Sequence, residues 1–207
     1  MMFMNTALLF ALLGYLSGSV LYARVYAALC GVQDASLSGE DHNPGAANAF
    51  QYGGFRYGLF VLVGDIFKAL IPVALYFHLV DFAPEDPWLG LVIAAPVIGH
   101  IFPIFWHFHG GKGIAATFGS LLGIFPVWQP AILLAVLFIT FAVIIKIRPN
   151  YYMTMVVYTL FLVGSFFIQV PLNVISGMVL ISCTVLLRLA LSKEERPVME
   201  VIPVWKH

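Results

Sequence analysis

Long apolar stretches separated by short polar segments follow one another along the whole chain. A helix needs about 20 apolar residues to cross the hydrocarbon core of a bilayer. The pattern predicts seven membrane-embedded helices, at residues 5–30, 57–80, 88–108, 114–125, 128–147, 151–168 and 172–191. The fourth is too short to cross a flat core alone, which is typical of a half-helix whose irregular neighbours are buried in protein. Two GxxxG pairs, Gly14 with Gly18 and Gly119 with Gly123, indicate close helix packing.

The composition agrees with a membrane protein and excludes an ordinary soluble domain. Of the 207 residues, 61% are hydrophobic and 10% are charged, and the mean hydropathy is +0.96. Soluble domains carry about a quarter charged residues, and a water-facing surface of this composition would be apolar and would aggregate. No repeat or long linker divides the chain, so we expect residues 1–207 to form one polytopic membrane domain.

The positions of the basic residues predict an orientation. Ten basic residues balance ten acidic ones, so the net charge gives no indication of a nucleic-acid partner. With seven spans, every Lys and Arg falls on one side of the membrane, and such a bias marks the cytoplasmic side. The prediction is therefore an all-α integral membrane protein of about seven transmembrane helices, with the N-terminus outside and the C-terminus in the cytoplasm. The first residues lack the basic region of a signal peptide and are expected to be a retained first span.

The first loop, residues 31–55, is long and rich in small and amide side chains. Asn43, Gly45 and Asn48 stand close together in it, and small residues let backbone N–H groups approach a ligand. The sequence Asn-Pro-Gly is also strong turn chemistry, so an ordinary polar turn is an equal alternative.

A second polar loop reads Gly110, Gly111, Lys112, Gly113 and leads into the short fourth helix. Glycines around a lysine at the start of a helix present backbone donors and a positive charge, which suits a phosphate. The spacing is not that of a nucleotide-binding P-loop. A flexible turn with a cytoplasmic lysine is the alternative, but the helix too short to span favours an anion site.

Three ionisable residues lie inside predicted spans. His100 could be a base, a donor to phosphate or a satisfied core residue, because a histidine in a span usually faces the bundle interior. Asp65 and Lys68 are three residues apart on one helix face. They could form a structural ion pair or could help to shape a polar pocket. His107 and His109 have no carboxylate or cysteine nearby to complete a metal site, so no metal is expected.

These pieces, in this order, resemble the bacterial membrane glycerol-3-phosphate acyltransferases that use acyl phosphate as donor. The first span contains the glycine- and serine-rich GYLSGS at residues 14–19, and the family's GSGNxGATN loop corresponds to EDHNPGAAN at 40–48. A D-x-x-K in the second span matches Asp65 and Lys68. The most specific match is GHxFPxFxxFxGGKGxAT, against GHIFPIFWHFHGGKGIAA at residues 99–116. The resemblance is good over roughly residues 10–125.

The resemblance implies an enzyme of phospholipid synthesis in the cell membrane, with its active face in the cytoplasm. It implies transfer of a fatty acyl group from acyl phosphate to the 1-hydroxyl of glycerol 3-phosphate, without a cofactor, beside membrane lipid. His100 and Lys112 would be catalytic, and the 110–113 loop would bind phosphate. The residues implied in substrate binding are Ser19, Asn43, Gly45, Asn48, Asp65, Lys68 and Arg148.

The chain also departs from the family pattern. The serine of the family's GSGN is replaced in the corresponding EDHN at residues 40–43. Thr117 stands one residue after the position of the threonine in the family's GGKGxAT. The serines of the family's RYVSLGS are missing from RPNYYMT at residues 148–154. The last motif, H-x-x-N-I-x-R-L-x-x-G-x-E, is hard to recognise in residues 188–196. A paralogue that binds or transports a phosphorylated lipid precursor, or that uses another acceptor, therefore remains the alternative.

Overall fold

The computed structural model describes residues 2–39, 41–80, 86–192, 194 and 196–206. Its α-helices are α1 (Met2–Gly18), α2 (Tyr22–Cys30), α3 (Ala46–Leu79), α4 (Leu89–Ile101), α5 (Ile114–Gly123), α6 (Gln129–Ile139), α7 (Asn150–Gly164) and α8 (Leu172–Leu191). A π-helical turn, Thr140–Ile144, continues α6, and 3-10 turns lie at Ala35–Leu37, Ile104–Trp106 and Val204–Lys206. Two short strands, β1 (Ile147–Arg148) and β2 (Glu200–Val201), pair antiparallel.

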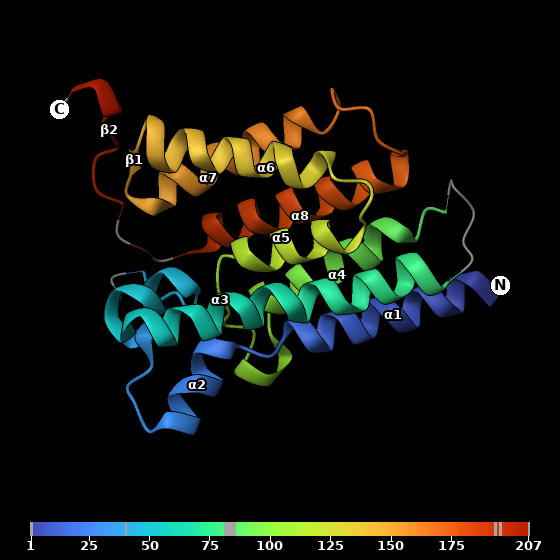
Figure 1. The fold of residues 1–207 in the computed structure, drawn as a ribbon, viewed down its shortest axis with the longest axis horizontal. Coiled ribbons are helices and arrows are strands. Elements are labelled where there is room, and N and C mark those ends of the chain that lie inside the picture. Colours follow the sequence, from blue (N-terminus) through green and yellow to red (C-terminus); the bar gives the residue numbers. More distant parts are fainter. Residues whose placement is uncertain (1, 40, 81–85, 193, 195, 207) are drawn as a thin grey trace.

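The helices run back and forth along one long direction, and the two chain ends lie at opposite ends of the bundle (Figure 1). The most extensive helix contacts are α3 with α5, α1 with α4, and α4 with α8. The loop before α3, the β1–β2 pair and the C-terminal segment all lie at the same end, on the left of Figure 1. This end therefore gathers the polar loops.

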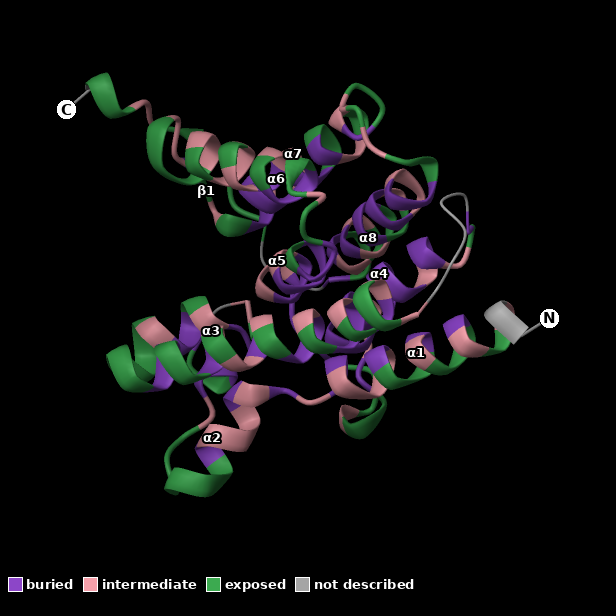
Figure 2. Cartoon of the chain, turned by 45° about the vertical axis from the view of Figure 1, so that its right-hand side comes forward, coloured by how far each residue is buried: buried purple, intermediate pink, exposed green. Residues whose placement is uncertain are grey.

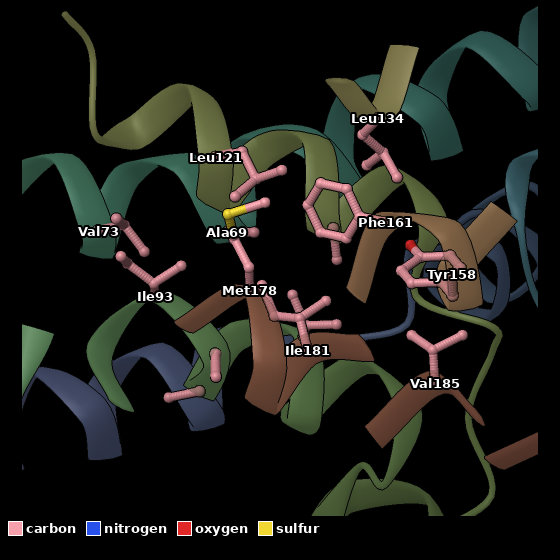
Figure 3. Packing of buried hydrophobic residues seen from close by; sticks show 14 of the residues in the cluster. Ala69, Val73, Ile93, Leu121, Leu134, Tyr158, Phe161, Met178, Ile181 and Val185 are labelled. Atoms are coloured by element: carbon pink, nitrogen blue, oxygen red, sulfur yellow. The ribbon is translucent and has the colours of Figure 1, made fainter. Parts of the chain in front are cut away.

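The core forms where α4, α5 and α8 meet, while the outward faces of α1, α3 and α6 are exposed (Figure 2). Buried apolar side chains of seven helices form this core, including Val73, Ile93, Leu121, Phe161 and Met178 (Figure 3). Large apolar side chains such as those on the outside of α1 and α3 remain exposed, as lipid-facing positions require.

The glycine pairs permit the close helix contacts that the sequence predicted. A Cβ on Gly18 would lie 2.0 Å from the carbonyl oxygen of Pro96 in α4. A Cβ on Gly119 would lie 2.1 Å from the carbonyl oxygen of Ile66 in α3. Only a residue without a side chain fits at either place, so both pairs serve helix packing.

Each of the seven predicted stretches contains a helix, but the structure supports fewer complete spans. In the described part of the chain, three helices are long and apolar enough to cross a membrane: α3, the helix at Leu89–Trp106, and α8. A fourth span results if α1 and α2, which meet at a bend of 44°, are counted together. The α5 helix has ten residues, in agreement with the predicted short fourth helix. The fold is mostly helical, with the β1–β2 pair as an unpredicted addition.

Three predicted boundaries differ most from the structure. The first predicted span breaks between Gly18 and Tyr22, so it is two helices. The first loop ends at residue 45 and not at 55, because helix-forming residues after Gly45 start α3, which kinks at Gly54 (φ +82°). The third span ends its α-helix at Ile101, because the residue before Pro103 is disfavoured in a helix. Part of the predicted loop at residues 81–87 lies outside the described residues.

Candidate active site

The glycine-rich loop before α5 folds back onto the end of α4. Gly110 and Gly111 donate their backbone N–H groups to the carbonyl oxygens of Ile101 and His100, both at 3.2 Å. A Cβ on Gly110 would lie 1.9 Å from the His100 carbonyl oxygen, so the backbone approaches too closely for any side chain. The backbone N–H of Lys112 donates to Asn43 Oδ1 at 3.0 Å. These three amides are engaged within the chain, so the Lys112 ammonium is the charge that this loop offers to a ligand.

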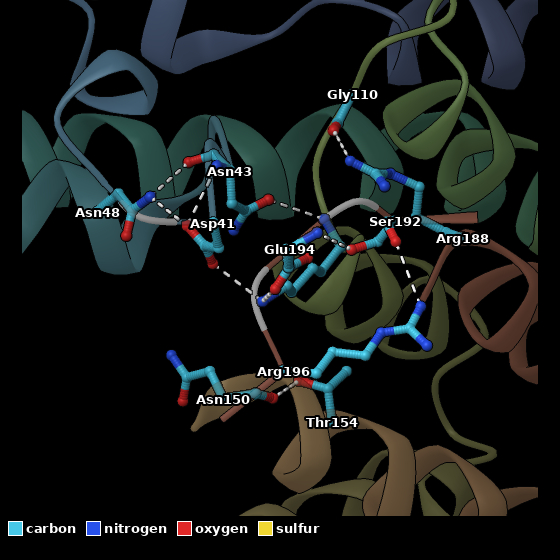
Figure 4. A network of polar contacts seen from close by, with 11 residues as sticks. Asp41, Asn43, Asn48, Gly110, Asn150, Thr154, Arg188, Ser192, Glu194 and Arg196 are labelled. Atoms are coloured by element: carbon cyan, nitrogen blue, oxygen red, sulfur yellow. Dashed lines mark hydrogen bonds and ion pairs between the residues drawn. The ribbon is translucent and has the colours of Figure 1, made fainter. Parts of the chain in front are cut away.

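The Lys112 ammonium is held between two carboxylates that are far apart in the sequence. Its Nζ lies 2.9 Å from Asp41 Oδ2 and 2.9 Å from Glu194 Oε2. Asp41 comes from the first loop and Glu194 from the segment after α8, so three separate parts of the chain meet here (Figure 4). Lys112 is only 5% exposed, so an anionic ligand has to compete with these carboxylates for the Lys112 ammonium.

The Asp41 carboxylate is fixed by the asparagines of the first loop. Asn48 Nδ2 donates to Asp41 Oδ1 at 2.8 Å and to the Asn43 carbonyl oxygen at 3.0 Å. The backbone N–H of Asn43 also donates to Asp41 Oδ1. Burial alone would raise the pKa of the Asp41 carboxyl, but the Lys112 ammonium and these hydrogen bonds hold that pKa below its usual value. The first loop is therefore held in a fixed conformation by side-chain hydrogen bonds and by the contact with Lys112.

Two cavities of about 230 Å³ each have Lys112 in their lining. The first is polar, and its lining residues are Asp41, Asn48, Gln51, Tyr52, Lys112, Pro149, Asn150, Tyr151, Glu194 and Pro197. The second is mostly apolar, and its lining residues are Asn43, Gly45, Ala46, Ala47, Leu62, Asp65, Ile66, His100, Lys112, Gly113, Ile114, Ala115 and Phe118. The Lys112 side chain thus stands where a polar site and an apolar site adjoin.

A buried triad of Asp65, Lys68 and His100 lies beside the apolar cavity. Lys68 Nζ is 2.7 Å from Asp65 Oδ1 and 2.8 Å from His100 Nδ1. It also donates to the carbonyl oxygen of Val20 at 2.6 Å, in the break between α1 and α2. The sequence predicted the Asp65–Lys68 pair as one of two alternatives, but it did not predict that His100 joins it.

Seven of the twelve predicted site residues line the cavities that contain Lys112, and Lys68, Gly110 and Gly111 lie next to His100 without lining either cavity; Ser19 and Arg148 stand apart. Ser19 is buried, donates to the Tyr15 carbonyl oxygen and accepts from the Ile104 N–H, so it joins α1 to the turn after α4. Arg148 is exposed in β1, and it lines neither cavity although the next residues do. Neither residue is in the lining that contains Lys112.

The lining residues that the sequence analysis missed include four polar ones of the polar cavity: Asp41, Asn150, Tyr151 and Glu194. Asp41 stands where the family motif has serine, and Asn150 and Tyr151 follow Arg148 in the segment where the family serines are missing. Glu194 stands at the final glutamate of the poorly matched last motif. The signal for all four was therefore their position in a motif, since Asp41, Asn150 and Tyr151 differ in type from the motif residues and only Glu194 matches.

The chain is similar to known proteins over most of its length. The family model described as glycerol-3-phosphate acyltransferase matches residues 8–195. A glycerol-3-phosphate acyltransferase of Pseudomonas aeruginosa (strain LESB58) is 41% identical over 127 residues, which are 61% of this chain and 64% of that protein. One of Actinobacillus pleuropneumoniae serotype 5b (strain L20) is 44% identical over 119 residues, 58% of this chain and 59% of that protein. The aligned region thus spans less than two thirds of these relatives' length.

Two crystal structures share the fold over most of the chain. Both are of PlsY, an integral membrane glycerol 3-phosphate acyltransferase. The lysophosphatidic acid form has a TM-score of 0.74 at 27% identity and covers 88% of this chain and 87% of that one. The glycerol 3-phosphate form has a TM-score of 0.75 at 26% identity and covers 88% of each chain. The apolar helices and this likeness identify a multi-pass helical membrane protein, and the match over residues 8–195 shows that the chain belongs to the glycerol-3-phosphate acyltransferase family.

Proposed function

We propose that this protein transfers a fatty acyl group from acyl phosphate to the 1-hydroxyl of glycerol 3-phosphate, giving lysophosphatidic acid and phosphate. In this reaction the hydroxyl oxygen forms a bond to the acyl carbonyl carbon, and the bond from that carbon to the phosphate oxygen breaks. The phosphate leaves with the electron pair, and the hydroxyl proton is taken up by the departing phosphate. A mixed anhydride has a good leaving group, so positioning and charge stabilisation can supply the catalysis.

The observation that carries the proposal is the position of Lys112 between the two cavities. Acyl phosphate has an apolar chain and a phosphate, and it needs an apolar site that meets a cation. The apolar cavity supplies the first need and the Lys112 ammonium the second. The polar cavity, with Asn48 and Asn150 in its lining, offers hydrogen-bonding groups to the glycerol part of the acceptor. The two substrates would then meet at Lys112.

The remaining assignments follow from this arrangement. Lys112 neutralises the phosphate of the donor, His100 lies in the apolar cavity near the reacting carbonyl, and Asn43 and Asn48 order the first loop around the acceptor. The seven-span topology, with the polar end in the cytoplasm of the cell membrane, belongs to the same proposal. This topology is supported by the Lys and Arg residues, which would all lie on the cytoplasmic side. It also gives the water-soluble acceptor direct access to the polar end of the protein.

The test is direct turnover by the purified protein. With acyl phosphate and radiolabelled glycerol 3-phosphate in detergent or vesicles, we expect labelled lysophosphatidic acid and released phosphate. A Lys112→Met variant of similar size should lose activity about a hundredfold or more, because it removes the charge opposite the leaving group. No product from the wild-type protein, under conditions in which the Pseudomonas aeruginosa relative is active, would refute the proposal.

A second candidate is a protein that binds or transports a phosphorylated lipid precursor without chemistry. One observation favours this candidate. The carboxylates of Asp41 and Glu194 pair with the Lys112 ammonium and so reduce the positive charge that could stabilise a transition state. This candidate predicts saturable binding of acyl phosphate or lysophosphatidic acid together with no turnover. Restored growth of a strain that lacks its own glycerol-3-phosphate acyltransferase, when this chain is expressed, would exclude it as the sole role.

A further inference from the structure

We infer that Lys68 fixes the tautomer of His100, so that the imidazole is neutral, carries its proton on Nε2 and acts as a hydrogen-bond donor in the apolar cavity. Lys68 is then a positioning residue for the reaction proposed above. The inference rests on that proposed function for its purpose, but the tautomer itself is a property of the resting protein.

The argument begins with the Lys68 ammonium, which has three N–H donors and no acceptor. Three acceptors surround its Nζ: the Val20 carbonyl oxygen at 2.6 Å, Asp65 Oδ1 at 2.7 Å and His100 Nδ1 at 2.8 Å. The three N–H groups thus face three neighbours: Val20 and His100 accept hydrogen bonds, and Asp65 Oδ1 forms an ion pair with the ammonium without a hydrogen bond of good geometry. This count works only if His100 Nδ1 is an unprotonated acceptor.

The other protonation states leave buried groups unsatisfied. A proton on Nδ1 would place two donors against each other at 2.8 Å, in the tautomer with Nδ1–H and in the imidazolium alike. A neutral Lys68 amine could accept from Nδ1, but it would leave the buried Asp65 carboxylate without a counter-charge, which is costly. The arrangement with Asp65 ionised, Lys68 charged and His100 neutral leaves no net charge in the triad.

The proton on Nε2 lies on the side of the glycine-rich loop. A Cβ on Gly111 would be 2.4 Å from His100 Nε2 and 3.0 Å from Asn43 Oδ1, so the absence of a side chain leaves room beside this nitrogen. The His100 ring lines the apolar cavity together with Lys112. Among the described residues, none forms a hydrogen bond with Nε2, so this N–H is available to a ligand.

This geometry distinguishes between two roles for the histidine. A protonated Nε2 cannot accept the proton of the acceptor hydroxyl, so His100 is not the general base. It can donate to a carbonyl or phosphate oxygen on which negative charge develops during acyl transfer. The proton of the hydroxyl consequently leaves by another route, and the triad holds the donor in place before the substrate arrives.

The test is the tautomer of His100 in the resting protein. Long-range nitrogen–proton NMR spectra of histidine-labelled protein in detergent distinguish the two neutral tautomers from each other and from the imidazolium. His100 is assigned as the signal that is lost in His100→Gln. We expect a protonated Nε2 and a bare Nδ1 in the wild type. A proton on Nδ1 would overturn the inference, whether or not the protein is active.

A charge-balanced variant tests the role of Lys68. Asp65→Asn combined with Lys68→Met removes both charges together, so that no unpaired charge is left in the membrane. We expect the Nδ1-protonated form to appear in this variant and kcat to fall tenfold to a hundredfold with little change in KM. An unchanged tautomer there would show that Lys68 does not set it. If it fails to fold, the wild-type spectrum still decides.

A matched pair of substitutions at His100 separates donor from base. The amide of His100→Gln reaches approximately the place of Nε2 and can donate, whereas the shorter His100→Asn reaches only the place of Nδ1. We expect Gln to retain at least tenfold more activity than Asn. Equal loss in both would contradict the donor role. If the tautomer is as expected but the wild type forms no product, the proposed function fails and the assignment of the triad remains.

Discussion

Removal of the Glu194 charge should strengthen phosphate binding at Lys112. Glu194 Oε2 lies 2.9 Å from Lys112 Nζ, and the two side chains are 10% and 5% exposed. At an effective dielectric constant of about 20, charges at this distance attract by about 6 kcal/mol. Desolvation and the hydrogen bond that glutamine can still make offset most of this energy. We expect a net gain of about 1–2 kcal/mol, or about 5- to 30-fold tighter binding.

The assay for Glu194→Gln is calorimetric titration with inorganic phosphate, supported by the KM for glycerol 3-phosphate. The matched control is Glu200→Gln, which makes the same change on β2 in the same C-terminal segment, outside both cavity linings. This control should leave phosphate affinity within twofold. Unchanged or weaker binding in Glu194→Gln, with a normal control, would refute competition between the Glu194 carboxylate and phosphate for Lys112.

Three further outcomes follow from the site. Lys112→Arg should keep part of the activity that is lost in Lys112→Met, because the positive charge remains although its geometry changes. Equal loss of activity by both variants in a turnover assay would count against neutralisation of the phosphate by this charge. The pKa of Asp41 is below its usual value, so its ionised form stabilises the fold above about pH 4 and that stability is lost as pH falls through the lower folded pKa. Thermal melts of the wild type should therefore drop more steeply than those of Asp41→Asn at acid pH, and parallel curves would refute this. Gly110→Ala should destabilise the fold by several kcal/mol because its Cβ meets backbone at 1.9 Å, whereas Gly31→Ala, with open space and φ +64°, should cost only about 1–2 kcal/mol in the same melts.

The apolar pattern predicted where helices lie, because burial in a bilayer demands long runs of apolar residues. It did not predict where they break. Gly54 kinks α3 through a positive φ that a glycine allows but does not require, and the break before Tyr22 depends on a lysine in another helix. Such features arise from tertiary contacts, so they cannot be read from local composition.

Only part of the candidate site was predicted, because the rest of it also depends on tertiary contacts. The glycine-rich loop predicted an anion site around Lys112, and the structure places that lysine next to both cavities. Two carboxylates contact the Lys112 ammonium. Asp41 is 71 residues away from Lys112 in the sequence, and Glu194 follows α8, so no local sequence pattern connects either of them with this lysine. The backbone amides of Gly110 and Gly111 also looked available in the sequence, but the fold uses them against the end of α4.

The bend between α1 and α2 has a consequence for how the chain assembles in the membrane. The break leaves the Val20 carbonyl without a helical partner, and the Lys68 ammonium of α3 satisfies it at 2.6 Å. An unpaired carbonyl in hydrocarbon costs several kcal/mol, and an unpaired lysine there is unfavourable as well. Each segment therefore carries a group that only the other can satisfy. The bent form of the N-terminal helices and the position of Lys68 in α3 consequently depend on each other, and neither segment is fully satisfied in the bilayer without the other.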